Sequence, residues 1–189
     1  MSESSTSFEE LLEVLKHAAA ALREADVRFV LGGGLAIWAR GGPETEHDVD
    51  FFIKPEDAER ALEALGSAGF RTETPPEGWL YKGWRGDVMV DLIFAPTGLA
   101  VDDRWLDRAE ELEVHAVRMP VMIADDVLVA KLLAMREHEV DYDQVLEIAR
   151  TVREQIDWDG VRAATDGSPY AKAFFTLVDE LGLSGSREA

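Results

Sequence analysis

The amino-acid sequence predicts an α+β fold, in which a half that mixes strands and helices precedes a half that contains helices alone. Three observations support this prediction. Short apolar runs alternate with amphipathic segments up to about residue 123, only helical spacing recurs after it, and no repeat or low-complexity linker is present. We therefore expect an α/β core at residues 1–123 and a C-terminal helical subdomain at residues 124–189.

The composition limits the classes of protein to which the chain can belong. Its 189 residues and 47% hydrophobic content suffice for a buried core, and no apolar run has the length of a membrane-spanning helix. The first residues lack the basic and apolar regions of a signal peptide, so we expect a soluble, cytoplasmic protein. Because cysteine is absent, disulfides and thiolate metal sites are excluded.

The charge balance limits the partners. The chain has 19 basic and 38 acidic residues, a net charge of −19 at pH 7. Such a surface repels polyanions, so an extended nucleic-acid-binding face is not expected, although a local basic pocket is compatible with it. Any metal must bind to carboxylates or histidines, and oxygen ligands favour Mg²⁺ or Mn²⁺.

The chain opens with an amphipathic helix at residues 8–24. Leu11, Leu15 and Leu22 share one face at helical spacing, and Ser7 with Glu10 forms a capping-box pattern in front of them. We interpret this helix as a packing element without a chemical role.

A glycine cluster follows the first predicted strand. Residues 28–31 form a short apolar run, Gly32, Gly33 and Gly34 follow it, and residues 35–40 have helical character. Glycine lets the backbone approach an anion closely, and the first N–H groups of a helix can bind phosphate. The cluster is therefore either a phosphate-binding turn or a tight turn that the fold requires.

Two aspartates introduce the next predicted strand, at residues 48–53. Asp48 and Asp50 are two residues apart, so in a strand their side chains project from the same face. Two such carboxylates repel each other unless a positive group lies between them. The apolar residues 51–53 argue against the alternative, which is a solvated loop.

A helix at residues 54–65 and two strands, at residues 70–73 and 79–84, are expected next. Lys82 and Arg85 bring positive charge into the second of these strands and the turn after it. Either could contact a nucleotide or an acceptor, but exposure to solvent is the simpler interpretation.

An apolar strand pattern at residues 88–94 carries one acidic residue, Asp91, in its middle. A buried carboxylate must be hydrogen-bonded, paired or metal-bound, because an isolated charge is too costly there. This strand could lie beside the one that carries Asp50. Asp91 is then either a satisfied core residue or a third carboxylate next to Asp48 and Asp50.

The rest of the chain is mostly helical. We expect a short helix at 102–109, strand segments at 112–117 and 119–123 interrupted by Pro120, and helices at 126–137, 143–153, 158–164 and 168–181. Lys131 lies among apolar residues of the first long helix. From these surroundings alone we expect its ammonium group to extend to solvent, the alternative being contact with a phosphate.

Together these residues form a pattern that resembles a known superfamily. Gly33-Gly34-Leu35-Ala36-Ile37, then Glu46-His47-Asp48-Val49-Asp50-Phe51, then Asp91 on a later strand, are similar to the nucleotidyltransferases that share the catalytic fold of DNA polymerase β. Within that superfamily the chain most resembles the lincosamide and aminoglycoside 2″-nucleotidyltransferases and the AbiEii-type nucleotidyltransferase toxins. The resemblance covers most of residues 28–150.

The resemblance implies a mixed β-sheet core flanked by helices, with a metal site on the sheet. By this resemblance Asp48 and Asp50 bind a divalent metal, Mg²⁺ or Mn²⁺, together with the triphosphate of an NTP. Asp91 completes the metal site or acts as base toward the acceptor hydroxyl. Converging carboxylates on a rigid sheet suit this chemistry, because metal ions stabilise the attacking and leaving oxygens of nucleotidyl transfer.

The resemblance also implies phosphate contacts. Gly33 and Gly34 form the turn over the phosphates, and Lys131 becomes a candidate contact to the triphosphate. One departure concerns the residues just before the aspartate pair, where Glu44 and Glu46 stand in place of the basic residues that relatives often carry. Acidic side chains near a triphosphate are unfavourable.

The leading functional hypothesis is a metal-dependent nucleotidyltransferase that moves an NMP group from an NTP, such as ATP, to a hydroxyl of an acceptor. The acidic composition favours a cationic small molecule or a protein over nucleic acid as that acceptor. Two alternatives are a toxin–antitoxin-type transferase that acts on RNA and a non-catalytic binding module with the same fold. The intact set of aspartates opposes the last alternative, whereas Glu44 and Glu46 favour it.

Overall fold

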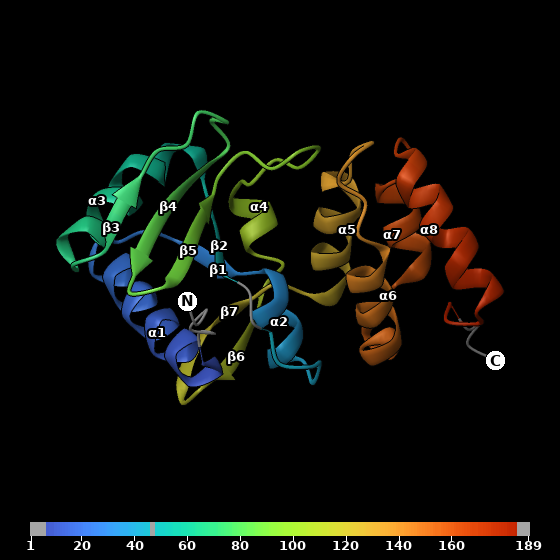
Figure 1. The fold of residues 1–189 in the computed structure, drawn as a ribbon, viewed down its shortest axis with the longest axis horizontal. Helices are drawn as coiled ribbons and strands as arrows, with labels where there is room; N and C mark the ends of the chain where they lie inside the picture. The colour runs from blue at the N-terminus through green and yellow to red at the C-terminus, as the bar shows by residue number, and fades with distance from the viewer. Residues whose placement is uncertain (1–6, 46–47, 185–189) are drawn as a thin grey trace, which may run out of the picture.

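The structure is a computed structural model that describes residues 7–45 and 48–184, and these form one mixed β-sheet with helices packed around it (Figure 1). The sheet has seven strands in the order β3-β4-β5-β2-β1-β7-β6. The strands are β1 (Phe29–Leu31), β2 (Val49–Ile53), β3 (Arg71–Glu73), β4 (Leu80–Arg85), β5 (Val88–Ile93), β6 (Glu110–Val114) and β7 (Val117–Val121). This architecture is the expected α+β fold.

The helices lie on both faces of the sheet and at one end of it (Figure 1). They are α1 (Phe8–Glu24), α2 (Gly33–Ala39), α3 (Ala58–Ser67), α4 (Asp103–Leu106), α5 (Ala124–Ala134), α6 (Tyr142–Thr151), α7 (Trp158–Ala164) and α8 (Pro169–Glu180), with short 3₁₀ helices η1 (Pro55–Asp57) and η2 (Arg153–Gln155). None of the helices in the described ranges is long and apolar enough to cross a membrane.

The side chains of β4 point alternately to the two faces of the sheet, and their contacts show which helices cover each face. Gly83 approaches Leu65 of α3, and α1 contacts both α3 and β5, so α1 and α3 cover one face. Lys82 precedes Gly83 and therefore points to the opposite face. On that opposite face Phe52 of β2 contacts Trp105 of α4, with ring centroids 5.4 Å apart.

The centre of the sheet is a rigid, buried support. β2 pairs in parallel with β5, and β1 pairs antiparallel with β2 and parallel with β7. Leu31, Phe51 and Leu92 of these strands are fully buried. Polar side chains that project from the central strands are therefore held in fixed positions by the core beneath them.

The C-terminal helices α5 to α8 pack against one another and form the end of the molecule drawn from gold to red in Figure 1. α5 also contacts α2, and Gln155 Nε2 donates a hydrogen bond to the carbonyl of Arg40 at 3.0 Å. The run of helices thus begins at α5, near the expected junction. A division into a core at residues 1–123 and a subdomain at 124–189 stays a prediction.

The strand expected at residues 112–117 is wrong in its bounds. β6 spans Glu110–Val114, and His115 and Ala116 form a turn, with φ of 47° and 63°, before β7 begins. β6 is an edge strand with exposed glutamates, so an apolar pattern does not show it. Pro120 lies inside β7 rather than interrupting it, because β7 pairs with β1 only at its last residue.

Arg40 attaches the end of α2 to the end of β7. Its side chain is 7% exposed, donates to the carbonyls of Met122 at 2.7 Å and Val121 at 3.2 Å, and pairs with Glu110 at 2.7 Å. We expect Arg40→Met to lower the free energy of unfolding by about 3 kcal/mol, because charge-assisted hydrogen bonds are lost. Denaturant unfolding measures this, and the exposed Arg136→Met serves as control. A free energy unchanged by Arg40→Met would contradict the prediction.

Candidate active site

Lys82, Asp91 and Asp50 form a row across three neighbouring strands, called the charged row below. Lys82 of β4 is the register partner of Asp91 of β5, and Asp91 is the register partner of Asp50 of β2. Register partners project from the same face, so all three side chains lie on the face opposite α1 and α3. Lys82 Nζ lies 3.2 Å from Asp91 Oδ1 and its side chain is 23% exposed. The interpretation of Lys82 as a solvated strand residue is therefore wrong.

Asp48 lies just before β2, which begins at Val49, rather than inside the strand as expected. Its charge nevertheless reaches the charged row, since it raises the pKa of both Asp50 and Asp91. Asp50 and Asp91 are register partners, and Asp48 lies just before the strand that carries Asp50; we call the three residues the acidic trio.

Burial dominates the electrostatics of the acidic trio. It is the main reason that the pKa of Asp50 is raised to about 7, with Asp91 and Asp48 adding to the effect and Lys131 and Lys82 opposing it. Burial also raises the pKa of Asp91, against the influence of Lys82. Carboxylates in this situation gain from added positive charge.

The glycine turn lies directly against the Asp50 carboxylate. The N–H of Gly32 donates to the carbonyl of Asp50 at 2.8 Å, which connects the turn to β2. Gly33 has a φ of 59°, and a Cβ atom on it would lie 1.8 Å from Asp50 Oδ2. A Cβ atom on Gly34 would lie 2.7 Å from Thr45 Oγ1. Glycine is needed here because the backbone approaches the polar side chains of the site too closely for any other residue.

Lys131 reaches the acidic trio from α5. Its Nζ donates a hydrogen bond to Gln144 Oε1 of α6 at 2.7 Å, and its charge lowers the pKa of Asp50. Burial lowers the pKa of Lys131, whereas Asp50 and Asp141 raise it. The partly buried Lys131 thus lies on the wall of the cleft with its ammonium group bonded to Gln144.

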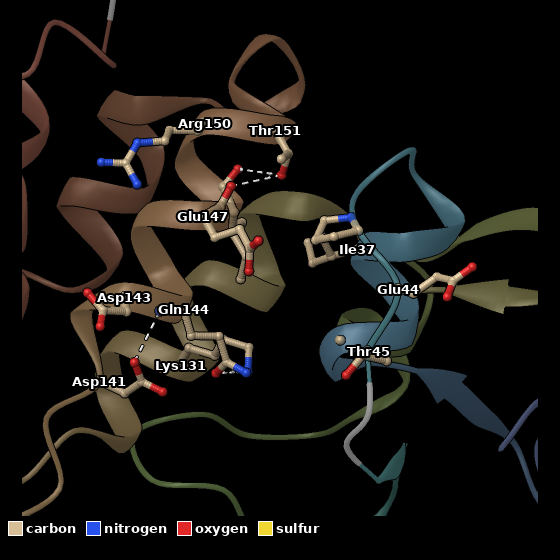
Figure 2. Close-up of a pocket in the computed structure, with 13 residues that line it drawn as sticks. Ile37, Glu44, Thr45, Lys131, Asp141, Asp143, Gln144, Glu147, Arg150 and Thr151 are labelled. Carbon is tan, nitrogen blue, oxygen red and sulfur yellow. Dashed lines mark hydrogen bonds between the residues drawn. The ribbon is translucent and has the colours of Figure 1, made fainter. Parts of the chain in front are cut away.

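A cleft of about 980 Å³ separates α2 and residues 43–45 from α5 and α6 (Figure 2). The charged residues that line it are Glu44, Asp141, Asp143, Glu147, Lys131 and Arg150. Gly34 of the glycine turn and Lys131 both line the cleft, whereas Asp48, Asp50 and Asp91 are not among its lining residues. Of the acidic residues expected before Asp48, Glu44 lines the cleft, whereas Glu46 and the neighbouring His47 lie outside the described residues.

The acidic trio fits a hard divalent cation in its donor chemistry. All its donors are carboxylate oxygens, which Mg²⁺ and Mn²⁺ prefer, and the raised pKa values of Asp50 and Asp91 indicate a deficit of positive charge. Within the described ranges the trio does not have ligand atoms within 4.8 Å of one another.

A second group, Glu9, Glu13 and His115, does meet that 4.8 Å limit. It lies on α1 and the β6–β7 turn, where both glutamates are exposed and lie 3.4 and 3.6 Å from His115 Nε2. Glu13 also pairs with Lys16. These contacts among the side chains account for the group without a metal.

The comparison with protein families agrees with this geometry. A family described as "Uncharacterised nucleotidyltransferase" matches residues 9–177. The chain belongs to this nucleotidyltransferase family. A search of curated proteins finds no match.

Solved nucleotidyltransferase structures share the fold. The solution structure of the antibiotic-resistance factor ANT(2″)-Ia has a TM-score of 0.65 at 13% identity and covers 93% of this chain and 98% of its own. The complex of ANT(2″)-Ia with adenylyl-2″-tobramycin also has a TM-score of 0.65, at 14% identity, covering 86% and 98%. The lincomycin-bound lincosamide antibiotic adenylyltransferase LnuA has a TM-score of 0.53 at 13% identity, covering 77% and 96%. The resemblance inferred from the sequence is confirmed.

The candidate site contains residues that the sequence pattern did not indicate. Gln144 is the hydrogen-bond partner of Lys131, and Glu147 and Thr151 follow it on the cleft side of α6. Their spacing of three and four residues is that of one helix face. That spacing is a usable signal, but it does not show which neighbour the face meets.

The contact between Gly33 and Asp50 can be separated from backbone strain. We expect Gly33→Ala to weaken Mn²⁺ binding at least about tenfold, because the new Cβ displaces the Asp50 carboxylate. Gly86→Ala is the matched control, since Gly86 has a φ of 61° but no atom within 4 Å of an added Cβ. Calorimetric Mn²⁺ titration and thermal unfolding compare the two. Equal Mn²⁺ affinities would contradict the role of this contact.

Asp50 makes the stability of the metal-free protein depend on pH. Its pKa of about 7 lies above the ordinary carboxyl value, so its stabilising contribution is present at low pH and is lost as the pH rises through 7. We expect Asp50→Asn to raise the melting temperature relative to wild type more at pH 8 than at pH 5, measured in a chelating buffer. Asp103→Asn is the control, because Lys54 lowers the pKa of Asp103, so the contribution of Asp103 is lost only below the ordinary carboxyl pKa and its removal should change the melting temperature equally at pH 5 and pH 8. A pH-independent Asp50→Asn difference would contradict the prediction.

Proposed function

We propose that the chain is a divalent-metal-dependent enzyme that moves a nucleoside monophosphate from an NTP to a hydroxyl of an acceptor held in the cleft. The observation that carries this proposal is the placement of Asp50 beside Asp91 on paired central strands, with Gly33 against one side of the carboxylate. Family membership supports transfer of a nucleotidyl group, and the cleft supports an acceptor site next to the acidic trio.

Each residue of the site has a role in this proposal. Asp48 and Asp50 hold Mg²⁺ or Mn²⁺ together with the triphosphate, and Gly33 and Gly34 allow the phosphates to approach the backbone. The bound metal supplies positive charge that stabilises the attacking and leaving oxygens. Lys131 lies on the cleft side of Asp50, where its ammonium group can balance the charge of the leaving pyrophosphate.

The reaction forms one bond and breaks one. The acceptor oxygen bonds to the α-phosphorus, the bond from that phosphorus to the oxygen bridging it to the β-phosphate breaks, and pyrophosphate leaves with the electron pair. The hydroxyl proton passes to Asp91, or to solvent if Asp91 serves as a metal ligand. Burial raises the pKa of Asp91, which makes its carboxylate a better proton acceptor than an exposed one.

The cleft favours a cationic acceptor. Glu44, Asp141, Asp143 and Glu147 outnumber the two basic residues on its wall, and the chain carries a net charge of −19. An amine-bearing small molecule or a protein side chain is attracted to such a wall, whereas RNA is repelled. The neighbour bound to adenylyl-2″-tobramycin supports a small-molecule acceptor. Glu44 also favours the alternative of a non-catalytic binding module, because an acidic residue close to a triphosphate weakens its binding.

The test of the function is a product assay. The protein is incubated with each NTP and Mg²⁺ or Mn²⁺ against hydroxyl-bearing acceptors, with and without amines, and with RNA. Pyrophosphate release and labelled products are followed. Pyrophosphate release that depends on an amine-bearing acceptor supports the proposal. Release that depends on RNA favours the toxin-type alternative instead. If neither pyrophosphate release nor NTP binding is observed, the non-catalytic binding module is favoured.

Removal of single charges tests the acidic trio. We expect Asp48→Asn, Asp50→Asn and Asp91→Asn each to lower pyrophosphate release at least about 100-fold, because each removes a charged oxygen donor. Asp57→Asn is the matched control. Asp57 is 8% exposed, compared with 9% for Asp91, but lies in η1 and pairs with Arg60 at 2.6 Å. Full activity in the three variants would refute the assignment.

A further inference from the structure

Lys82 occupies a position that a bound metal would share. Its Nζ lies 3.2 Å from Asp91 Oδ1 and 3.0 Å from Met89 Sδ, and its side chain is mostly shielded from solvent. The charge of Lys82 lowers the pKa of both Asp91 and Asp50, so the ammonium group acts on two members of the acidic trio at once. Lys82 is therefore the positive end of the charged row.

This position creates a competition. In the metal-free protein a lysine that balances the trio lowers the repulsion between its carboxylates. A divalent cation needs the same carboxylate oxygens, and an ammonium group close to them also repels the cation. Metal binding must therefore weaken the interaction between Lys82 and the carboxylates, and part of the stabilisation that this interaction supplies is lost.

We propose that Lys82 is a positioning residue that holds the Asp91 carboxylate in the metal-free protein and yields it to the divalent cation. The proposal rests on the function proposed above, because it assumes that Asp91 belongs to the metal site. It adds a property that the acidic trio alone does not explain: the site is stable without metal and binds metal more weakly than three carboxylates would by themselves.

The register of the hairpin makes this role specific to position 82. Only the residue opposite Asp91 on β4 shares both its face and its level in the sheet, and that residue is Lys82. Arg85 lies three residues along β4, points to the other face and donates to the carbonyl of Ala68 at 3.3 Å. It cannot take the place of Lys82.

The experiment uses the full chain, stripped of metal, and Mn²⁺ alone as the probe. Calorimetric titration at pH 8 compares wild type with Lys82→Met, which removes the charge, and Lys82→Arg, which keeps it. We expect Lys82→Met to lower the Kd for Mn²⁺ about tenfold and Lys82→Arg to change it less than about threefold. Lys54→Met is the matched control with unchanged Kd, since Lys54 is 18% exposed and pairs with Asp103 at 3.3 Å, beyond the end of β2.

Thermal unfolding gives a second readout that does not depend on activity. Without metal, Lys82→Met should melt below wild type, because the repulsion within the trio is no longer offset. Mn²⁺ should raise the melting temperature of Lys82→Met more than that of wild type, since ligand stabilisation grows with affinity. A folded Lys82→Met variant with an unchanged or higher Kd overturns the proposal.

An Asp91→Asn background separates this proposal from the proposed function. If Lys82 acts through Asp91, Lys82→Met should change the Mn²⁺ Kd less than about threefold in that background, and a full tenfold change there would overturn the proposal. Failure of the product assay with an intact Lys82 effect on Mn²⁺ binding would remove the transferase function alone. If nucleotidyl transfer is observed but Lys82→Met leaves the Mn²⁺ Kd unchanged, the proposed competition between Lys82 and the metal is refuted and the transferase function stands.

Discussion

The parallel pairing of β2 with β5 is the constraint on which the site depends. It fixes Asp50 beside Asp91 on the two central strands, where the buried core beneath them leaves little room for either residue to move. Two neighbouring carboxylates repel each other, and burial makes their charge more costly. Burial is the main reason that the pKa of both residues is raised, with Asp91 and Asp48 adding to the effect at Asp50 and Asp48 adding to it at Asp91. The arrangement of the surrounding elements can be understood as a response to this concentration of negative charge.

That response comes from separate parts of the chain. Lys82 enters from the β4–β5 hairpin on one side, and Lys131 enters from α5 on the side of the cleft. Gly33 leaves no side chain between the backbone and the Asp50 carboxylate. The two lysines thus lower the repulsion among the carboxylates, but the pKa of Asp50 is still raised. Added positive charge would stabilise such a site, as the metal-dependent transfer proposed above requires.

The fold and the cleft inform different levels of function. The family match places the chain among nucleotidyltransferases, while neighbours at 13–14% identity show the fold alone. In the proposed function, the choice of acceptor depends on the cleft wall, which is formed by residues 43–45 and by α5 and α6. The acidic side chains on this wall carry the argument for a cationic acceptor, and they are independent of the residues that bind metal in the proposed function.

Local chemistry was determined by the sequence itself. The turn at Gly33 and the aspartates at 48, 50 and 91 stand out because their signals come from neighbouring residues: glycine after a strand, and acids within apolar runs. The sequence also contained the position of Lys82, since a two-residue turn at residues 86–87 pairs 85 with 88 and therefore 82 with 91. The expectation that Lys82 is exposed to solvent does not take this pairing into account.

Only the tertiary structure decided how the helical half meets the sheet. Lys131 lies more than eighty residues after Asp50, and nothing in its apolar surroundings shows that its ammonium group faces that carboxylate and Gln144. The cleft between α2 and α6 has the same origin. Spacing along the chain specifies which face a side chain occupies, whereas packing between distant elements specifies what that face meets.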